Sequence, residues 1–228
     1  MPKHGKRYRT DLDKTPDRAE AVPLTEAVNR VKAFKEVKFD QSIDICIQLG
    51  IDPRQADQAV RGAVALPHGI GKTKRVVAFC GEDKVQEARE AGAVEAGGEV
   101  LVKKIEDGWM DFDVAVASPE MMRVVARLGR TLGPKGLMPS PKSGTVTPNV
   151  VEAVKEYRAG KVEFRNDAGG NVHAVVGKQS FAPEALEQNA KAFIDHIVKM
   201  RPSSAKGQYV RQISLSGTMT PGVAVQTP

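Results

Sequence analysis

The sequence has 228 residues, a formal net charge of +6 and a pI near 9.3, which favours an anionic partner such as a nucleic acid, a lipid headgroup or an acidic protein. No apolar stretch approaches the ~20 residues needed to span a bilayer, and the cations at the amino terminus have no apolar run behind them, so we expect neither a membrane span nor a signal peptide. The two cysteines fit a reducing cytoplasm, and an aromatic content of 5% argues against a sheet covered with base-stacking rings.

The first third of the chain predicts a basic arm, a helix over roughly 24–36 and two strands. In Ser42–Leu49 the apolar residues alternate strictly with Ser42, Asp44, Cys46 and Gln48. Such period-two alternation is typical of a strand with one buried face. A second strand is predicted over 59–66, ending before Pro67.

The middle of the chain has a different pattern. Continuous apolar runs at 75–80 and 114–117 predict buried strands, and helices are predicted over 83–91, 120–128 and 150–159. Short buried strands that alternate with helices are typical of a parallel α/β sheet.

After Gly160 the antiparallel pattern returns. Strands at 161–165 and 171–176 flank Asp167–Gly170 and predict a hairpin, with Val162 and Phe164 facing the core. The next helix follows Pro183 and carries one apolar stripe, made of Leu186, Ala190, Phe193, Ile197 and Met200. A last strand is predicted over 208–216.

The segment 127–146 interleaves glycines and prolines with four cations and contains no acidic residue. Proline and glycine together specify an irregular loop of one shape. A shaped cationic loop suits a phosphate backbone, whereas the alternative is a long connector that happens to be basic. The four cations are Arg127, Arg130, Lys135 and Lys142.

Enzymatic motifs are weak. Gly71-Lys72-Thr73 resembles the end of a P-loop, but the first glycine of that motif is replaced by Leu66 and no helix follows. Asp111 and Asp113 form either a metal-binding pair or a polar lead-in to a strand. The histidines lack zinc spacing, and no catalytic triad can be argued. We therefore expect no catalytic residue, metal site or cofactor, and keep a nucleotide-dependent hydrolase as the competing class.

The run Lys38–Ser42 precedes and opens the first strand. Lys38 offers a phosphate contact, Phe39 a ring for stacking or sugar packing, and Ser42 a donor for a 2′-OH. The alternative is that Phe39 is a hydrophobic plug at the end of the sheet.

The sequence strongly resembles the ribosomal protein L-one family, whose members form the mobile stalk beside the tRNA exit site. The signature loop at Leu128–Val146 carries the match, and further matches run along nearly the whole chain: Met1–Arg9, Lys38–Ser42, Leu49–Arg54, Val60–Gly62, Leu66–Lys72, Gly108–Asp113 and Phe164–Asp167.

This resemblance implies an α/β protein of two domains. Residues 1–68 and 160–228 would together form a split antiparallel α+β domain that binds RNA, and residues 69–159 an inserted Rossmann-like α/β domain. The crossings at Pro67–Gly69 and Ala159-Gly160 contain glycine, which permits a hinge.

The resemblance also implies a non-catalytic, cytoplasmic protein of the large ribosomal subunit that is monomeric when free and has no membrane partner. Its partners would be the stalk junction of large-subunit ribosomal RNA, its own mRNA, which it represses, and exit-site tRNA, whose movement and release it assists. The RNA-binding residues would be Glu26, Lys38, Phe39, Asp40, Ser42, Arg165, Asp167, His173, Thr218 and Met219. The cationic loop residues Arg127, Arg130, Lys135 and Lys142 would make a secondary nucleic-acid contact.

Three positions depart from the family pattern. Thr220 stands where the family usually has glycine, Gly169 where it has threonine, and Ser140 where asparagine is common. A threonine in place of glycine is expected to hold backbone further from RNA.

Overall fold

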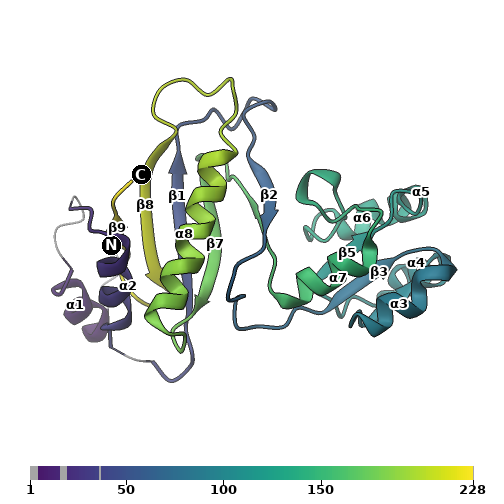
Figure 1. Ribbon diagram of the computed structural model, residues 1–228, viewed down its shortest axis with the longest axis horizontal. Coiled ribbons are helices and arrows are strands. Elements are labelled where there is room, and N and C mark those ends of the chain that lie inside the picture. The colour runs from purple at the N-terminus through teal and green to yellow at the C-terminus, as the bar shows by residue number, and fades with distance from the viewer. Residues whose placement is uncertain (1–4, 16–19, 36, 228) are drawn as a thin grey trace. The chain divides into compact units, whose positions relative to one another are not determined.

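The computed structural model describes residues 5–15, 20–35 and 37–227, so the first four residues of the predicted basic arm and the last position of the predicted 24–36 helix lie outside it. The chain divides into two compact units (Figure 1). Unit 1 is made of Met1–Gly71 and Val162–Pro228, and unit 2 of Lys72–Lys161. The fold is therefore α/β, with one unit inserted into another.

Unit 1 is built on a four-stranded antiparallel sheet of order β7-β1-β8-β9. Its strands are β1 (Ser42–Leu49), β7 (Asn171–Lys178), β8 (Val210–Gly217) and β9 (Val223–Val225). Helices α2 (Leu24–Lys32) and α8 (Pro183–Lys199) bury its apolar face, and α8 runs along the strands in Figure 1. The predicted alternation in β1 is confirmed, since Ile43, Ile45, Ile47 and Leu49 are all buried.

The predicted hairpin around Asp167–Gly170 is only partly right. The turn exists, but β6 (Val162–Arg165) pairs with β2 (Arg61–Val64) in a separate two-stranded sheet, whereas β7 pairs with β1. The two strands diverge because each finds a longer ladder with a partner distant in the sequence. Val162 and Phe164 do face the core.

Other differences in unit 1 are local. The basic arm contains a helix, α1 (Lys6–Leu12), α2 ends four residues before the predicted end, and the short strand β9 was not predicted. A three-residue strand is too short to show period-two alternation.

Unit 2 has a parallel sheet of order β4-β3-β5, made of β4 (Glu95–Gly97), β3 (Val76–Phe79) and β5 (Val114–Ala117). One face packs against α4 (Glu99–Glu106) and the helical turns after β5, and α7 (Val150–Ala159) contacts β3 and β5. The remaining helical segments are η1 (Glu82–Lys84), α3 (Val85–Glu90), α5 (Met122–Val125), η2 (Ala126–Leu128), α6 (Gly129–Leu132) and η3 (Pro141–Ser143).

Helix α7 has the predicted bounds, but β4 and α4 were not predicted. The helix predicted over 120–128 begins at Met122 and is broken into short turns, of which α6 occupies the start of the cationic segment. That segment is therefore helical at its beginning and, apart from the 3₁₀ turn η3, irregular after Leu132.

The first crossing between the units is fastened to unit 1. The buried Asn189 on α8 accepts the His68 N–H at 3.0 Å and donates to the carbonyls of Gly69 and Val176 at 2.9 and 2.8 Å. The predicted hinge at Pro67–Gly69 is thus held by α8, and the next glycine, Gly71, has φ of +71° and packs against Lys178 and Phe181 of unit 1. On the other side Gly160 ends α7 with φ of +113°.

None of the helices in the described part of the chain has both the length and the apolarity that a bilayer crossing requires.

Candidate nucleic-acid interface

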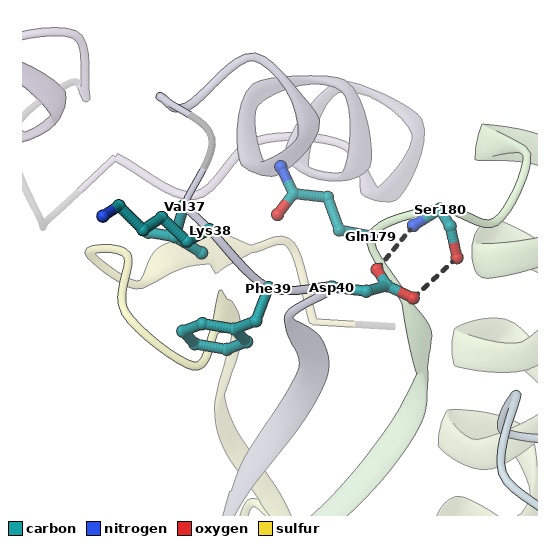
Figure 2. A pocket seen from close by; sticks show the side chains of 6 residues that line it. All are labelled: Val37, Lys38, Phe39, Asp40, Gln179 and Ser180. Atoms are coloured by element: carbon teal, nitrogen blue, oxygen red, sulfur yellow. Dashed lines mark hydrogen bonds between the residues drawn. The ribbon is translucent and has the colours of Figure 1, made fainter.

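One end of the unit 1 sheet gathers three segments that are distant in the sequence. Because β1 is antiparallel to both neighbours, its start lies beside the ends of β7 and β8. This end, called the sheet end below, comprises residues 37–42, 178–180 and 217–220. Six residues from its first two segments line an open hollow of about 370 Å³ (Figure 2).

Phe39 and Met219 are the large apolar side chains of the sheet end, and both are exposed to solvent, at 53% and 50%. Phe39 is therefore not a plug in the core. Lys38 is also exposed, and its side chain extends away from Asp40 in Figure 2. The two apolar groups and this cation are free to meet a ligand.

Asp40 and Gln41 fix the shape of the sheet end from inside. Asp40 accepts hydrogen bonds from the backbone and hydroxyl of Ser180, at 3.1 and 2.9 Å (Figure 2). The fully buried Gln41 donates its amide to Gln179 at 2.7 Å and accepts the Met219 N–H at 2.9 Å. Gln41 thus joins all three segments, although no sequence motif singles it out.

The loop after β8 is held at both of its ends. Thr218 exchanges hydrogen bonds with Ser42, since its N–H donates to the Ser42 carbonyl at 3.0 Å and its hydroxyl accepts the Ser42 N–H at 3.2 Å. Thr220 accepts the Gly217 N–H on its hydroxyl at 2.8 Å. The threonine that departs from the family pattern therefore closes this turn.

The face of the sheet opposite α2 and α8 carries small polar side chains and is called the open face. It presents Ser42, Asp44, Cys46 and Gln48 from β1, with His173 and Ser214 on either side of Cys46. Lys178, which no sequence motif singles out, donates to the Ser42 hydroxyl at 2.9 Å. Lys178 lies directly opposite Ser42 in the register of β1 with β7, and only this register points to the contact.

Burial dominates the electrostatics of this face. It raises the pKa of the Asp44 carboxyl, an effect that Lys178 and His173 partly offset. It also raises the pKa of the Cys46 thiol, with a smaller contribution from Asp167. The thiol is thus a neutral side chain rather than a reactive thiolate.

Asp167 and Arg165 lie towards the other end of β7, away from the sheet end. The Asp167 carboxylate accepts the N–H groups of Gly169 and Asn171 at 2.8 and 2.7 Å, and the Asn171 side-chain amide at 3.0 Å. These bonds, with the Asn171 side chain first, lower the pKa of Asp167 to about 2. His173 lies 3.6 Å from the same carboxylate, and Arg165 is exposed. Asp167 therefore organises its turn.

Glu26 is placed differently from the other predicted residues. It is exposed on α2 and forms an i,i+4 ion pair with Arg30. No hydrogen bond or ion pair among the described residues joins its side chain to the sheet end. The structure thus brings Lys38, Phe39, Asp40, Ser42, Thr218 and Met219 together, leaves His173 on the open face, and separates Arg165, Asp167 and Glu26 from the cluster.

In unit 2 the cationic segment has a defined shape. The buried Thr145 accepts the Ser140 N–H at 2.8 Å, and its carbonyl accepts the Ala117 N–H at 2.9 Å. Tyr157 on α7 donates to the Ser143 carbonyl at 2.9 Å. The four cations Arg127, Arg130, Lys135 and Lys142 are exposed, and none of them has an acidic partner within the described part of the chain.

The other motifs have structural explanations. Arg75 pairs with both Asp111 and Asp113, and its hydrogen bonds lower the pKa of Asp113. Thr73 leads into β3 without an intervening helix, so no helix N-terminus faces a phosphate site there. Among residues 5–15, 20–35 and 37–227 there is no group of three acidic, histidine or cysteine side chains that could hold a metal ion.

Comparison with known proteins identifies the class as ribosomal. The pattern that defines the Ribosomal protein L1p/L10e family matches residues 31–221. The chain is similar to the large ribosomal subunit protein uL1 of Chlorobaculum tepidum, with 51% identity over 99% of this chain and 97% of that protein. The uL1 proteins of Nitratidesulfovibrio vulgaris and Chlorobium phaeobacteroides are 50% and 52% identical, over 99% and 97% of this chain and 95% and 96% of their own lengths.

The chain belongs to the Ribosomal protein L1p/L10e family, as its sequence motifs imply. Members of this family are structural, non-enzymatic proteins, which decides against a hydrolase.

Proposed function

We propose that this protein binds the stalk junction of large-subunit ribosomal RNA through the sheet end and the open face of unit 1. The observation that carries the proposal is the convergence of Phe39, Met219, Lys38 and the Ser42–Thr218 pair at one end of the sheet. Exposed apolar groups beside a cation and hydroxyl groups suit the sugar–phosphate edge of a structured RNA.

The wider setting of this proposal follows from family membership. As a uL1-type ribosomal protein, the chain is a structural constituent of the large ribosomal subunit and is located on the cytoplasmic ribosome, where ribosomal RNA is its partner. The proposal concerns which surface makes that contact.

Two further roles involve one surface of each unit. If its own mRNA presents a fold like the stalk junction, the sheet end will bind it and repress translation. The exposed cations of unit 2 give a second contact, which we assign to exit-site tRNA during its movement and release. We further propose that the free protein is a monomer, which sedimentation of the purified protein tests directly.

The deciding experiment is a salt titration of binding to a stalk-junction RNA fragment. Lys38→Gln should weaken binding and reduce the slope of log K against log salt by about one unit, because one phosphate contact is lost. Lys191→Gln, on the opposite side of the sheet on α8, is the matched control and should leave the slope unchanged. An unchanged slope in Lys38→Gln would remove Lys38 from the interface.

Competition distinguishes the two RNA targets. The leader of the protein's own mRNA should displace the stalk fragment, whereas an unrelated RNA of equal length should not. Failure of the wild-type protein to prefer the stalk fragment over the unrelated RNA would reject the proposed function as a whole.

A further inference from the structure

Helix α1 is fastened across the sheet end by two hydrogen bonds. Arg7 donates from Nη2 to the Met219 carbonyl at 2.9 Å. Asp11, one turn later and fully buried, accepts the Lys35 N–H at 3.1 Å. The helix therefore links the loop after β8 to the segment that leads to Lys38 and Phe39.

The hydrogen bond from Arg7 helps to fix the backbone of Met219. Its N–H is held by Gln41 and its carbonyl by Arg7, so the backbone of Met219 is fixed on both sides while its side chain remains exposed. Arg7 Nη1 is buried and has no hydrogen-bond partner among the described residues.

The outer side of α1 is cationic. Lys6 and Arg9 are both exposed and neither has an acidic partner in the described ranges. The acidic residue within the helix, Asp11, is buried: its Oδ1 accepts the Lys35 N–H, and its Oδ2 has no hydrogen-bond partner among the described residues. With Lys35 and Lys38, which are also exposed, these side chains place a positive surface next to Phe39 and Met219.

We infer that α1 is part of the RNA-binding surface: Lys6 and Arg9 contact phosphates of the bound RNA, and Arg7 positions the Met219 loop for it. This inference rests on the proposed function and extends the same RNA-binding site to helix α1. Its physical basis is that exposed cations near a bound polyanion displace condensed counterions, which gives each contact a measurable salt dependence.

The test uses the full chain with Lys6→Gln and Arg9→Gln combined. Both side chains are exposed, so the thermal midpoint should not change. Binding to the stalk-junction fragment should weaken by about tenfold at 0.1 M salt, and the salt slope should fall by about 1.5 units. The matched control is Lys191→Gln with Lys199→Gln on α8, which removes the same charge from the far side of the sheet and should change neither quantity by more than its measurement error.

The outcomes separate the two proposals. If log K of the wild-type protein falls steeply with log salt and the α1 variant keeps the same slope, α1 has only a structural role and the inference is overturned. A loss of affinity without a change of slope also overturns it, because a phosphate contact must alter the slope. If the wild-type protein does not bind the fragment, the proposed function itself fails.

Discussion

Phe39 shows how one side chain can be assigned to binding rather than to folding. Its ring is 53% exposed, whereas Phe34, five residues earlier, is 3% exposed in the core of unit 1. Phe39→Ala should therefore cost about 1–3 kcal/mol of RNA affinity with little change in thermal stability. Phe34→Ala should instead cost about 3–5 kcal/mol of folding stability. Measuring both quantities on both variants would reject this assignment if the two profiles were alike.

Asp167 gives a prediction about pH. Its folded-state pKa of about 2 lies below the ordinary 3.8, chiefly through the Asn171 side chain. A lowered pKa means that the bonds of the turn are present above pH 4 and are lost as the pH falls through about 2. The amide signals of Gly169 and Asn171 should titrate in NMR spectra with a midpoint near 2.

A single substitution checks the cause of the lowered Asp167 pKa. Asn171→Ala should move that midpoint up towards the ordinary value, because the largest contribution has been removed. Asp167→Asn should abolish the titration. A midpoint near 4 in the unaltered protein would show that the carboxylate does not hold the turn.

At the scale of elements, the side chain of Gln41 joins the three segments of the sheet end by hydrogen bonds. Replacing it by alanine leaves the Met219 N–H and the side-chain carbonyl oxygen of Gln179 without their buried partner. We expect a loss of about 1–3 kcal/mol in the free energy of unfolding, and weaker RNA binding in the fraction that remains folded. Gln48→Ala, on the half-exposed face of the same strand, should cost less than about 0.5 kcal/mol in chemical denaturation. Equal costs for the two would contradict this role.

Elements with strong local patterns could be predicted from the sequence. The β1 strand has the predicted bounds because its apolar residues alternate without exception, and α7 because Gly160 ends it. The α4 helix was missed because Val100 in its first turn is 81% exposed and blurs the apolar stripe formed by Leu101, Val102 and Ile105. The pairing of β6 with β2 was missed because register between distant strands leaves no local signal.

The candidate site, too, could be predicted from the sequence only in part. Phe39 and Thr218 could be singled out from family motifs, but the bonding of Asp40 to Ser180 depends on contacts across 140 positions of sequence. Lys178 reaches Ser42 only through strand register, and Arg7 reaches Met219 only because α1 folds back. Motifs therefore found the exposed residues of the proposed RNA site, whereas the residues that position them required the structure.

At the scale of the whole molecule, the two units are expected to divide the work. Unit 1 carries the sheet end, and unit 2 carries a shaped segment whose four cations are exposed. Since Asn189 holds Gly69 and the side chains of Lys178 and Phe181 pack on Gly71, we expect any movement between the units to occur after Gly71 and at Gly160. Gly160, with its positive φ, can absorb a change in backbone angles on the second connection.

This division predicts the effect of removing the charge of the cationic segment. Changing Arg127, Arg130, Lys135 and Lys142 together to glutamine should leave affinity for the stalk RNA within about 1.4 kcal/mol, or about tenfold, because the sheet end is untouched. In a reconstituted translation assay the same variant should slow departure of tRNA from the exit site. The matched control changes Lys103, Lys155, Lys191 and Lys199, exposed cations on α4, α7 and α8, to glutamine, which removes the same total charge.

Each alternative result has a distinct meaning. Loss of stalk binding in the cationic-segment variant would make that segment a primary determinant and would contradict the assignment of the main site to unit 1. An equal slowing by the control variant would point to net charge rather than to the shaped loop. If neither binding nor tRNA departure changes, the bonds from Thr145 and Tyr157 serve only to fold a connector, and the exposed cations have no nucleic-acid partner.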